Sequence, residues 1–385
     1  MQVQGLRWAS SGDLVPSPGQ DAIDPALVLY FGSRDGIASG GIFAQLKSRF
    51  PDAQIIGCST GGQIHDDDNL DDEIAAVAIT FESTQVRVAS RSVETVDETR
   101  ASARAIAEEL NAPDLAGIFI LSDGLNVNGS ELVAGITDIV GKDIPLTGGL
   151  AGDGAQFEQT LLGVNDTPRS HLVAGIGFYG ACVRFGHGSA GGWDVFGPRR
   201  RITRSSGNVL YDLDGEPALD LYERYLGDEA AGLPSTGLLF PLQIVDPDQP
   251  DHKIVRTILG IDRERRSMTF AGEIPDGWNA QLMRGNFARL AEGAADAARQ
   301  ASHAIGDQPA HSGLALMVSC IGRRLLMGQR TMEEVEAASA SLPAGFHRMG
   351  FYSYGEISPH AESGICELHN QTMTVTTIHE ADAPA

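Results

Sequence analysis

Basic residues are scarce in this sequence: 28 lysines and arginines stand beside 51 aspartates and glutamates, which gives a formal net charge of −23. Proteins that bind nucleic acid through its phosphates need a basic surface, so this balance argues against that class. The sequence also has no apolar run near the length of a membrane span and no basic, then apolar, N-terminal signal. We therefore expect a cytoplasmic protein that neither enters a membrane nor binds nucleic acid.

Cysteines are few as well. The four of them, Cys58, Cys182, Cys320 and Cys366, lie far apart and form no CxxC pair. That spacing suits reduced thiols in a cytoplasm and does not match a disulfide framework or a zinc site.

Aromatic residues make up only 6% of the chain, although 42% of it is hydrophobic. Because a chain of 385 residues is longer than a single hydrophobic core usually supports, we expect two domains.

A stretch of very small residues, GCSTGG at 57–62, follows a short apolar strand predicted at 54–56. Glycines let another molecule approach the backbone closely, and free N–H groups together with the hydroxyls of Ser59 and Thr60 can hold an anion. In open α/β sheets, ligands usually bind at such strand ends. A tight chain crossing without a ligand explains the same residues equally well.

A second glycine-rich stretch, PLTGGLAGDGAQF, begins at Pro145. It follows a buried-type strand at 116–122 and a helix that we expect over 131–140, capped by Ser130. Strand, small loop, helix, strand and small loop in this order indicate an α/β fold with both glycine loops at one edge of the sheet. Neither loop matches GxGxxG or precedes GKS or GKT, so we assign no nucleotide site.

Two charged clusters have simple structural explanations. The acidic run HDDDNLDDE at 65–73 lacks the glycine and glutamate that an EF-hand requires, so a solvated turn explains it better than calcium binding. Arg199, Arg200, Arg201 and Arg204 form the main basic cluster. Ion pairs with acidic neighbours explain this cluster better than contacts with a propionate or a phosphate.

As a whole, the chain resembles the FIST proteins, a sensory family named for its F-box and intracellular signal-transduction settings. The resemblance rests on several segments in a fixed order: GCSTGGQI, GGLAGDGAQF, LYDLDGEPALDLYERYLG, LLFPLQI, SCIGRR, GFYSYGEI and LHNQTMTVTTI. It implies an α/β architecture with mixed sheets flanked by helices and divided into FIST N and FIST C domains. We place a loose lead-in at 1–25, FIST N at 26–215 and FIST C at 216–385, with the boundary near Gly215.

The resemblance implies a sensor that binds a small molecule, proposed in the family to be amino-acid-like. We expect the ligand in a cleft shared by both domains, where backbone N–H groups and an arginine hold a carboxylate and a carboxylate holds an amine. Turn capping explains Asp123 and Asn370 as well as ligand binding does. The candidate contacts are Cys58, Ser59, Thr60, Gly61, Asp123, Gly149, Asp153, Arg256, Cys320, Arg323, Glu356 and Asn370.

The output of such a sensor is a second expectation from the resemblance. Family members stand alone or are joined to histidine kinases, cyclic-di-GMP enzymes or chemoreceptors. No kinase or receptor segment is left over in this chain, so we expect it to report to a separate partner such as a histidine kinase or a cyclic-di-GMP enzyme.

One subgroup of the family is similar over GHGSAGGWDVFGPRRRITRS, at 186–205, and some of its members bind haem and sense nitric oxide. That similarity makes His187 a candidate axial ligand, because imidazole is a usual proximal ligand of haem iron. His347 and His369 also stand where they could reach a pocket. A structural histidine is the alternative for each. There is no CxxCH motif, so the attachment would be non-covalent.

An enzyme is the third hypothesis, with Cys58 as a nucleophile in a loop that resembles an oxyanion cradle. The GxSxG elbow is not reproduced, because Ser59 rather than Cys58 stands at its middle position and we expect strand residues after the loop. A small packed thiol explains Cys58 better. We name no catalytic residue and expect a binding protein.

Overall fold

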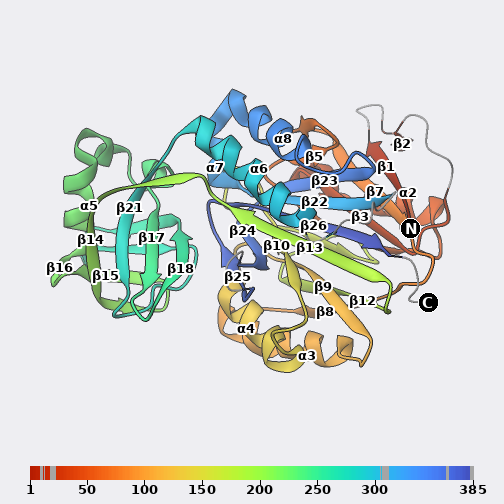
Figure 1. Ribbon diagram of the computed structural model, residues 1–385, viewed down its shortest axis with the longest axis horizontal. Coiled ribbons are helices and arrows are strands. Elements are labelled where there is room, and N and C mark those ends of the chain that lie inside the picture. The colour runs from red at the N-terminus through yellow and green to blue at the C-terminus, as the bar shows by residue number, and fades with distance from the viewer. Residues whose placement is uncertain are drawn as a thin grey trace.

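The computed structural model describes residues 1–8, 12, 14–17, 23–303, 305, 312–360 and 364–381. Most of them belong to three six-stranded sheets and the helices that flank them, from which a separate, mainly β unit projects at the left of Figure 1. The chain leaves the three sheets along β14 (Trp193–Ser206) and returns along β21 (Asn279–Gly285). These two strands pair antiparallel from Trp193 opposite Gly285. We call 193–285 the β-domain and the remaining described chain the body.

The first sheet of the body is built from the N-terminal third of the chain. Its β3 is buried at every position, as expected for the continuous apolar run LVLYFG. Helices α1 (Arg34–Ala38) and α2 (Gly41–Arg49) contact its β4. The strand order is β11 (Leu162–Val164), β4 (Gln54–Ser59), β3 (Leu27–Gly32), β7 (Ile74–Thr80), β1 (Gln2–Trp8) and β2 (Leu14–Pro16).

The second sheet joins strands from both halves of the chain. Helices α3 (Thr99–Leu110) and α4 (Gly129–Val140) pack on each other, α3 against β8 and β12 and α4 against β25. Parallel pairing of β9 with β10 beside antiparallel neighbours makes the sheet mixed. Its order is β25 (Cys366–His369), β24 (Gly355–Pro359), β10 (Leu146–Leu150), β9 (Leu115–Ser122), β12 (Leu172–Tyr179) and β8 (Gln85–Ser92).

The third sheet also mixes early and late strands. Helix α6 (Phe287–His303) lies against β13 and β26 and packs on α8 (Met332–Ser339), while α7 (Ile321–Met327) follows β22 directly. The order is β13 (Val183–Ala190), β26 (Met373–Glu380), β22 (Gly313–Cys320), β23 (Phe346–Ser353), β5 (Gln63–His65) and β6 (Asp68–Leu70).

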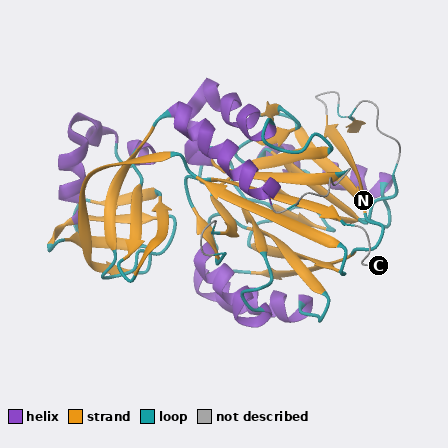
Figure 2. Cartoon of the chain, in the orientation of Figure 1, coloured by secondary structure: helices purple, strands orange, loops and turns teal. Residues whose placement is uncertain are grey.

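The three sheets share one apolar interior and carry their helices on the outside (Figure 2). Phe31, Phe119, Phe178 and Phe351 come from all three sheets and are at most 1% exposed. The rings of Phe31 and Phe351 lie 4.5 Å apart. Burial of such side chains is the main favourable contribution to the free energy of folding, at roughly 25 cal/mol per Å² of apolar surface removed from water.

The β-domain forms an eight-stranded sheet with helix α5 (Ala218–Leu226) packed on β15 and β20. Its core includes Ile202, Leu221, Tyr222 and Phe270. The strand order is β18 (Gln249–Arg256), β17 (Leu242–Asp246), β21, β14, β15 (Val209–Leu213), β20 (Ser267–Phe270) and β19 (Ile258–Asp262), with β16 (Glu216–Pro217) paired to β15.

Mixed sheets flanked by helices confirm the predicted α/β class. The predicted boundary residue, Gly215, stands at the turn between β15 and β16, inside the β-domain sheet. Strands from both sequence halves pair in the body, so its sheets are not divided at that point. The lead-in at 1–25 supplies β1 and β2, while its residues 9–11, 13 and 18–22 lie outside the described chain.

One local prediction was wrong and another is confirmed. Asn128, not Ser130, caps α4, because its side-chain oxygen accepts from the N–H groups of Ser130 and Glu131. The acidic run at 65–73 is the solvated turn that the sequence predicts: it forms the hairpin of β5 and β6, its Asp67, Asp68, Asp71 and Asp72 are exposed, and Arg7 pairs with Asp68 and Glu73.

Candidate functional site

The β-domain and the body enclose a cavity of about 220 Å³, which we call the interdomain cavity. The body contributes the loop after β9, the start of α7 and residues around β24. The β-domain contributes the ends of β18 and β20 and the segment before β15. The lining residues are Val96, Gly124, Leu125, Val127, Asn128, Leu150, Phe157, Asn208, Leu238, Thr257, Leu259, Phe270, Ala271, Gly272, Cys320, Ile321, Gly322 and Tyr354.

The carboxylate of Asp123 shapes one body wall. One oxygen accepts from the N–H groups of Leu125 and Asn126, each at 2.9 Å, and the other accepts from the N–H of His171 at 2.8 Å. Asp123 is fully buried. Its charge is therefore used to hold the loop Gly124–Asn128 against the cavity, as an Asx turn does.

A second body wall is the aromatic pair Phe157 and Tyr354, held in place by Asp153. The backbone N–H groups of Phe157, Glu158 and Gln159 donate to the Asp153 carboxylate at 2.9–3.0 Å, and the Tyr354 hydroxyl donates to it as well. Burial alone would raise the pKa of Asp153, but these hydrogen bonds outweigh it and lower that pKa.

The β-domain wall is more polar. The amide of Asn208 donates to the carbonyl of Phe270 at 2.8 Å, which links β15 to the end of β20. Thr257 lines the cavity, and its buried hydroxyl makes no hydrogen bond with any described residue. A buried hydroxyl without a partner is costly, so Thr257 has hydrogen-bonding capacity that the protein itself does not use.

Arg256 lies directly behind the β-domain wall. A Cβ at Gly272 would lie 2.9 Å from the guanidinium carbon of Arg256, so glycine is needed where the two meet. The guanidinium donates to the carbonyls of Glu273 at 3.0 Å and Leu368 at 3.1 Å. Burial lowers the pKa of Arg256 to about 10, and it forms no ion pair within the described chain.

Two protein-family models match this chain. A FIST N domain model matches residues 26–216 and a FIST C domain model matches residues 218–359. The chain belongs to the FIST family. FIST domains are sensory domains of signal transduction. Within the described ranges, no helix of this FIST chain is long and apolar enough to cross a membrane.

More distant similarities add little. This FIST chain is 27% identical over 197 residues to the uncharacterized protein MJ1623 of Methanocaldococcus jannaschii, and the match covers 48% of the chain and 37% of that protein. It thus spans well under half of that relative. A crystal structure of a cyanuric acid hydrolase from A. caulinodans overlaps 77% of the chain and 99% of its own, at 12% identity and a TM-score of 0.19. That score is too low to carry an argument.

The two glycine loops of the FIST N half do meet, but around packed atoms. The N–H of Gly152 donates to the carbonyl of Ser59 at 2.9 Å, and the N–H of Gly61 donates to that of Tyr352 at 2.8 Å. The Thr60 hydroxyl donates to the carbonyl of Gly32 at 3.3 Å. A Cβ at Gly149 would lie 2.8 Å from Val318. Ser59, Thr60, Gly61 and Gly149 therefore serve the packing of three sheets and do not line the interdomain cavity.

Other predicted contacts in the FIST C half have protein partners. Arg323 donates to Glu334 at 2.8 and 2.9 Å, and both side chains are fully buried. Glu356 accepts from the hydroxyls of Ser353 and Thr372, each at 2.9 Å. Burial raises the pKa of Glu356 to about 8. Arg323 and Glu356 are thus structural groups in the body.

Asn370 and Cys320 differ from these two. Asn370 is 1% exposed, and neither atom of its amide has a hydrogen-bond partner among the described residues.

Cys320 stands at the N-cap position of α7 and is the one predicted contact that lines the interdomain cavity. Burial, with the nearby Glu356, raises the pKa of the Cys320 thiol. Burial likewise raises the pKa of the Cys58 thiol, which disfavours the reactive thiolate of either cysteine.

His187 lies in β13 on the face that meets the second sheet. Its ring stacks on Phe185 with centroids 6.0 Å apart, and its buried nitrogens have no hydrogen-bond partner in the described chain. Burial lowers the pKa of His187 to about 4, so the imidazole is neutral. His187 does not line the interdomain cavity. An axial ligand needs open space beside its nitrogen, so the surroundings of His187 do not fit a haem.

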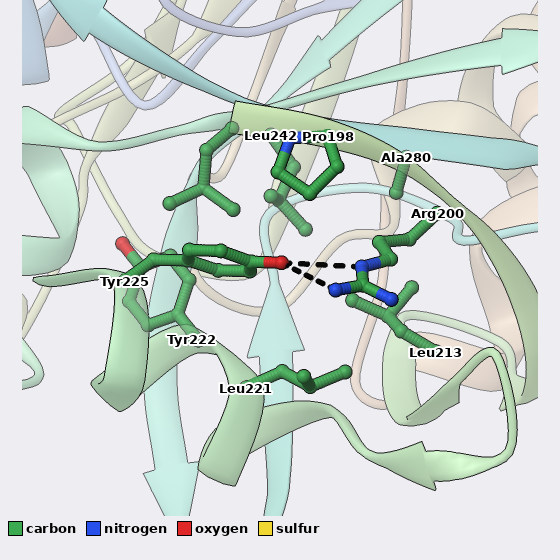
Figure 3. Close-up of a pocket in the computed structure, with 9 residues that line it drawn as sticks. Pro198, Arg200, Leu213, Leu221, Tyr222, Tyr225, Leu242 and Ala280 are labelled. Atoms are coloured by element: carbon green, nitrogen blue, oxygen red, sulfur yellow. Dashed lines mark hydrogen bonds between the residues drawn. The ribbon is translucent and has the colours of Figure 1, made fainter. Parts of the chain in front are cut away.

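The other two candidate histidines are partly buried or hydrogen-bonded, and two arginines of the basic cluster form ion pairs. The Nε2 of His369 lies 3.0 Å from the carbonyl of Ser358, and burial lowers the pKa of His347. Arg200 pairs with Asp214, and Arg204 pairs with Asp212. Figure 3 shows the guanidinium of Arg200 bonded to the hydroxyl of Tyr225 in a crevice of about 10 Å³, which is room for a single water.

Sequence reasoning missed most of the cavity lining. Phe157, Thr257, Ala271 and Tyr354 come from four distant segments, and each sits in an ordinary strand or turn pattern. The usable signal was the polar loop after the strand Leu115–Ser122, because strand ends often face ligands. Asp123 is a predicted ligand contact in that loop, but the residues that line the cavity are those that follow it, between Gly124 and Asn128.

Proposed function

We propose that this FIST protein is a ligand-binding sensor whose ligand occupies the interdomain cavity, and that it acts by binding without chemistry of its own. The observation that carries the proposal is the cavity of about 220 Å³ with walls from two structural units. Cavities between such units are common ligand sites, and a ligand there contacts both units at once.

Signal transfer would follow from contacts that already join the two units beside the cavity. His252 of the β-domain lies 2.9 Å from Glu367 of β25, Arg256 donates to the Leu368 carbonyl, and Gln371 donates to the Leu238 carbonyl at 3.2 Å. A ligand that prefers one arrangement of these units shifts the population toward it, since only differential affinity moves such an equilibrium. A separate cytoplasmic partner, such as a histidine kinase or a cyclic-di-GMP enzyme, would read that arrangement.

A thermal-shift screen of small metabolites against wild type and two variants tests the proposal. Ala271→Trp places an indole in the cavity wall, whereas Ala181→Trp makes the same change at an exposed turn after β12. Compounds that bind in the cavity should raise the Tm of wild type and of the control variant Ala181→Trp. They should not raise the Tm of Ala271→Trp. Hits that raise all three Tm values equally would overturn the proposed site.

A further inference from the structure

We propose that the ligand of the interdomain cavity is an uncharged, mainly apolar molecule with one or two hydrogen-bonding groups, and not a zwitterionic amino acid. This inference rests on the proposed function, because it assigns the chemical class of the ligand at that same site. It follows from the charge, polarity and exposure of the lining residues.

None of the lining residues carries a charged side chain. The carboxylates that hold the cavity walls already have partners in the protein: Asp123 accepts from backbone N–H groups, and Asp153 accepts from backbone N–H groups and pairs with Arg34 at 3.3 Å. Arg256 directs its hydrogen bonds to carbonyls behind Gly272. The ammonium and carboxylate of an amino acid would therefore lose water in this cavity without gaining a counter-charge, which costs several kcal/mol per ion.

Exposed apolar side chains gather at this cavity. Val96 is 48% exposed, Phe157 40% and Leu259 51%. These three are among only seven large hydrophobic residues that are exposed in the described chain, and all three line the cavity. Large exposed apolar side chains that cluster in a concave site favour an apolar ligand, because covering them removes their surface from water.

The polar groups of the lining limit the ligand to few hydrogen bonds. The buried hydroxyl of Thr257 has no partner within the described chain and can donate or accept. The carbonyl oxygen of Asn208 is a second acceptor, since the Asn208 amide uses its nitrogen for Phe270. The other polar side chains of the lining are the amide of Asn128, whose oxygen already caps α4, the hydroxyl of Tyr354, which is bonded to a carboxylate of the body, and the thiol of Cys320. Few polar groups are thus free for a ligand, which matches a molecule with one or two polar atoms.

Two fluorescent probes that differ only in one sulfonate test the charge. N-phenyl-1-naphthylamine is neutral and apolar with a single N–H, and 1-anilinonaphthalene-8-sulfonate is its anionic counterpart. We expect the neutral probe to bind the full chain saturably at one site and at least about tenfold tighter than the anion, as ionic groups are disfavoured without a counter-charge. Equal or tighter binding of the anion would overturn the inference.

Three variants test whether the neutral probe binds in the interdomain cavity. Ala271→Trp should abolish saturable binding of the neutral probe, while Ala181→Trp should leave it unchanged. Thr257→Val keeps the side-chain shape and removes the hydroxyl, so it should weaken binding by about two- to tenfold without lowering the Tm. Binding that persists in Ala271→Trp would mean that the probe sits elsewhere and would count against the inference.

The outcome is separable from that of the proposed function. If isothermal titration shows that an amino acid binds wild type but not Ala271→Trp, the sensor proposal stands and the uncharged class is wrong. If neither probe binds in the cavity and no metabolite distinguishes wild type from Ala271→Trp, both proposals fail.

Discussion

The rings of Phe157 and Tyr354 stack with their centroids 4.5 Å apart and their planes 15° from parallel. Phe157 is 40% exposed, and its φ of 53° lies in the left-handed region that bulky residues avoid. Burial alone would not hold it there. The Asp153 carboxylate, which binds the turn of Phe157 and the hydroxyl of Tyr354, fixes the pair as a wall of the interdomain cavity.

Asp153→Asn should therefore weaken ligand binding more than it destabilises the fold. One amide oxygen cannot accept all the N–H groups that the carboxylate accepts, so the turn carrying Phe157 loosens. Because the pKa of Asp153 is lowered in the folded state, its contribution is fully present above the ordinary value of 3.8 and is lost as pH falls through the folded value. Titration of N-phenyl-1-naphthylamine should give an affinity about tenfold lower at neutral pH. An unchanged affinity would show that Asp153 does not hold the wall.

Glu356→Gln should change the pH dependence of stability. The pKa of Glu356 is about 8 because of burial, against 4.5 ordinarily, so between these values the native state keeps a proton that the unfolded chain releases. Wild-type stability then falls with rising pH by at most about 1.4 kcal/mol per unit in that window. Glutamine can accept from Thr372 and donate to Ser353, so it mimics the protonated acid.

Urea unfolding from pH 5 to 9 measures this difference. The free energies of unfolding of wild type and Glu356→Gln should agree near pH 5 and diverge in favour of the variant toward pH 9. Parallel curves would contradict a raised pKa at Glu356.

Arg323→Met should be strongly destabilising, since it leaves the carboxylate of Glu334 buried without its partner. Loss of one member of a buried pair costs about 3–5 kcal/mol. The double variant Arg323→Met/Glu334→Leu should lose less than Arg323→Met alone, as both charges are gone. Arg299→Met, in an exposed pair with Asp296, should cost less than about 1 kcal/mol. Guanidinium unfolding compares these three variants and the single variant Glu334→Leu with wild type, and a double variant that loses as much stability as the two single changes summed would refute a coupled pair.

Cys58 and Cys320 should resist alkylation in the native protein, because burial raises the pKa of both thiols and only the thiolate reacts. Iodoacetamide at neutral pH, followed by peptide mass spectrometry, should label the partly exposed Cys182 first. Cys58 and Cys320 should become labelled only in denaturant. Rapid native labelling of Cys58 would revive a nucleophilic role.

The apolar strands could be predicted because they are buried on both faces. Runs such as LVLYFG at Leu27–Gly32 have no other plausible place in a folded chain, and the α/β class follows from their spacing. The glycine loops misled the site prediction. A Cβ at Gly124 would lie 1.9 Å from the carbonyl of Ala151, and one at Gly61 would lie 2.4 Å from Ile321. Small residues look the same in sequence whether a ligand or a neighbouring strand fills the space.

The β-domain wall was beyond sequence reasoning for a different reason. Thr257, Ala271 and Gly272 follow ordinary strands, and only the pairing of β14 with β21 carries them to the loop after β9. Such long-range juxtaposition has no local pattern. The missing hydrogen-bond partner of Thr257 is equally invisible until its surroundings are known.

Hydrogen exchange with and without a saturating cavity ligand, beginning with N-phenyl-1-naphthylamine, tests the central claim most directly. Binding between the two units should slow exchange together in Gly124–Asn128 and Cys320–Gly322 of the body and in Phe270–Gly272 of the β-domain. Ala271→Trp should abolish all three effects. Protection confined to one unit, or spread over segments away from these walls, would contradict a sensor that joins the β-domain to the body through its ligand.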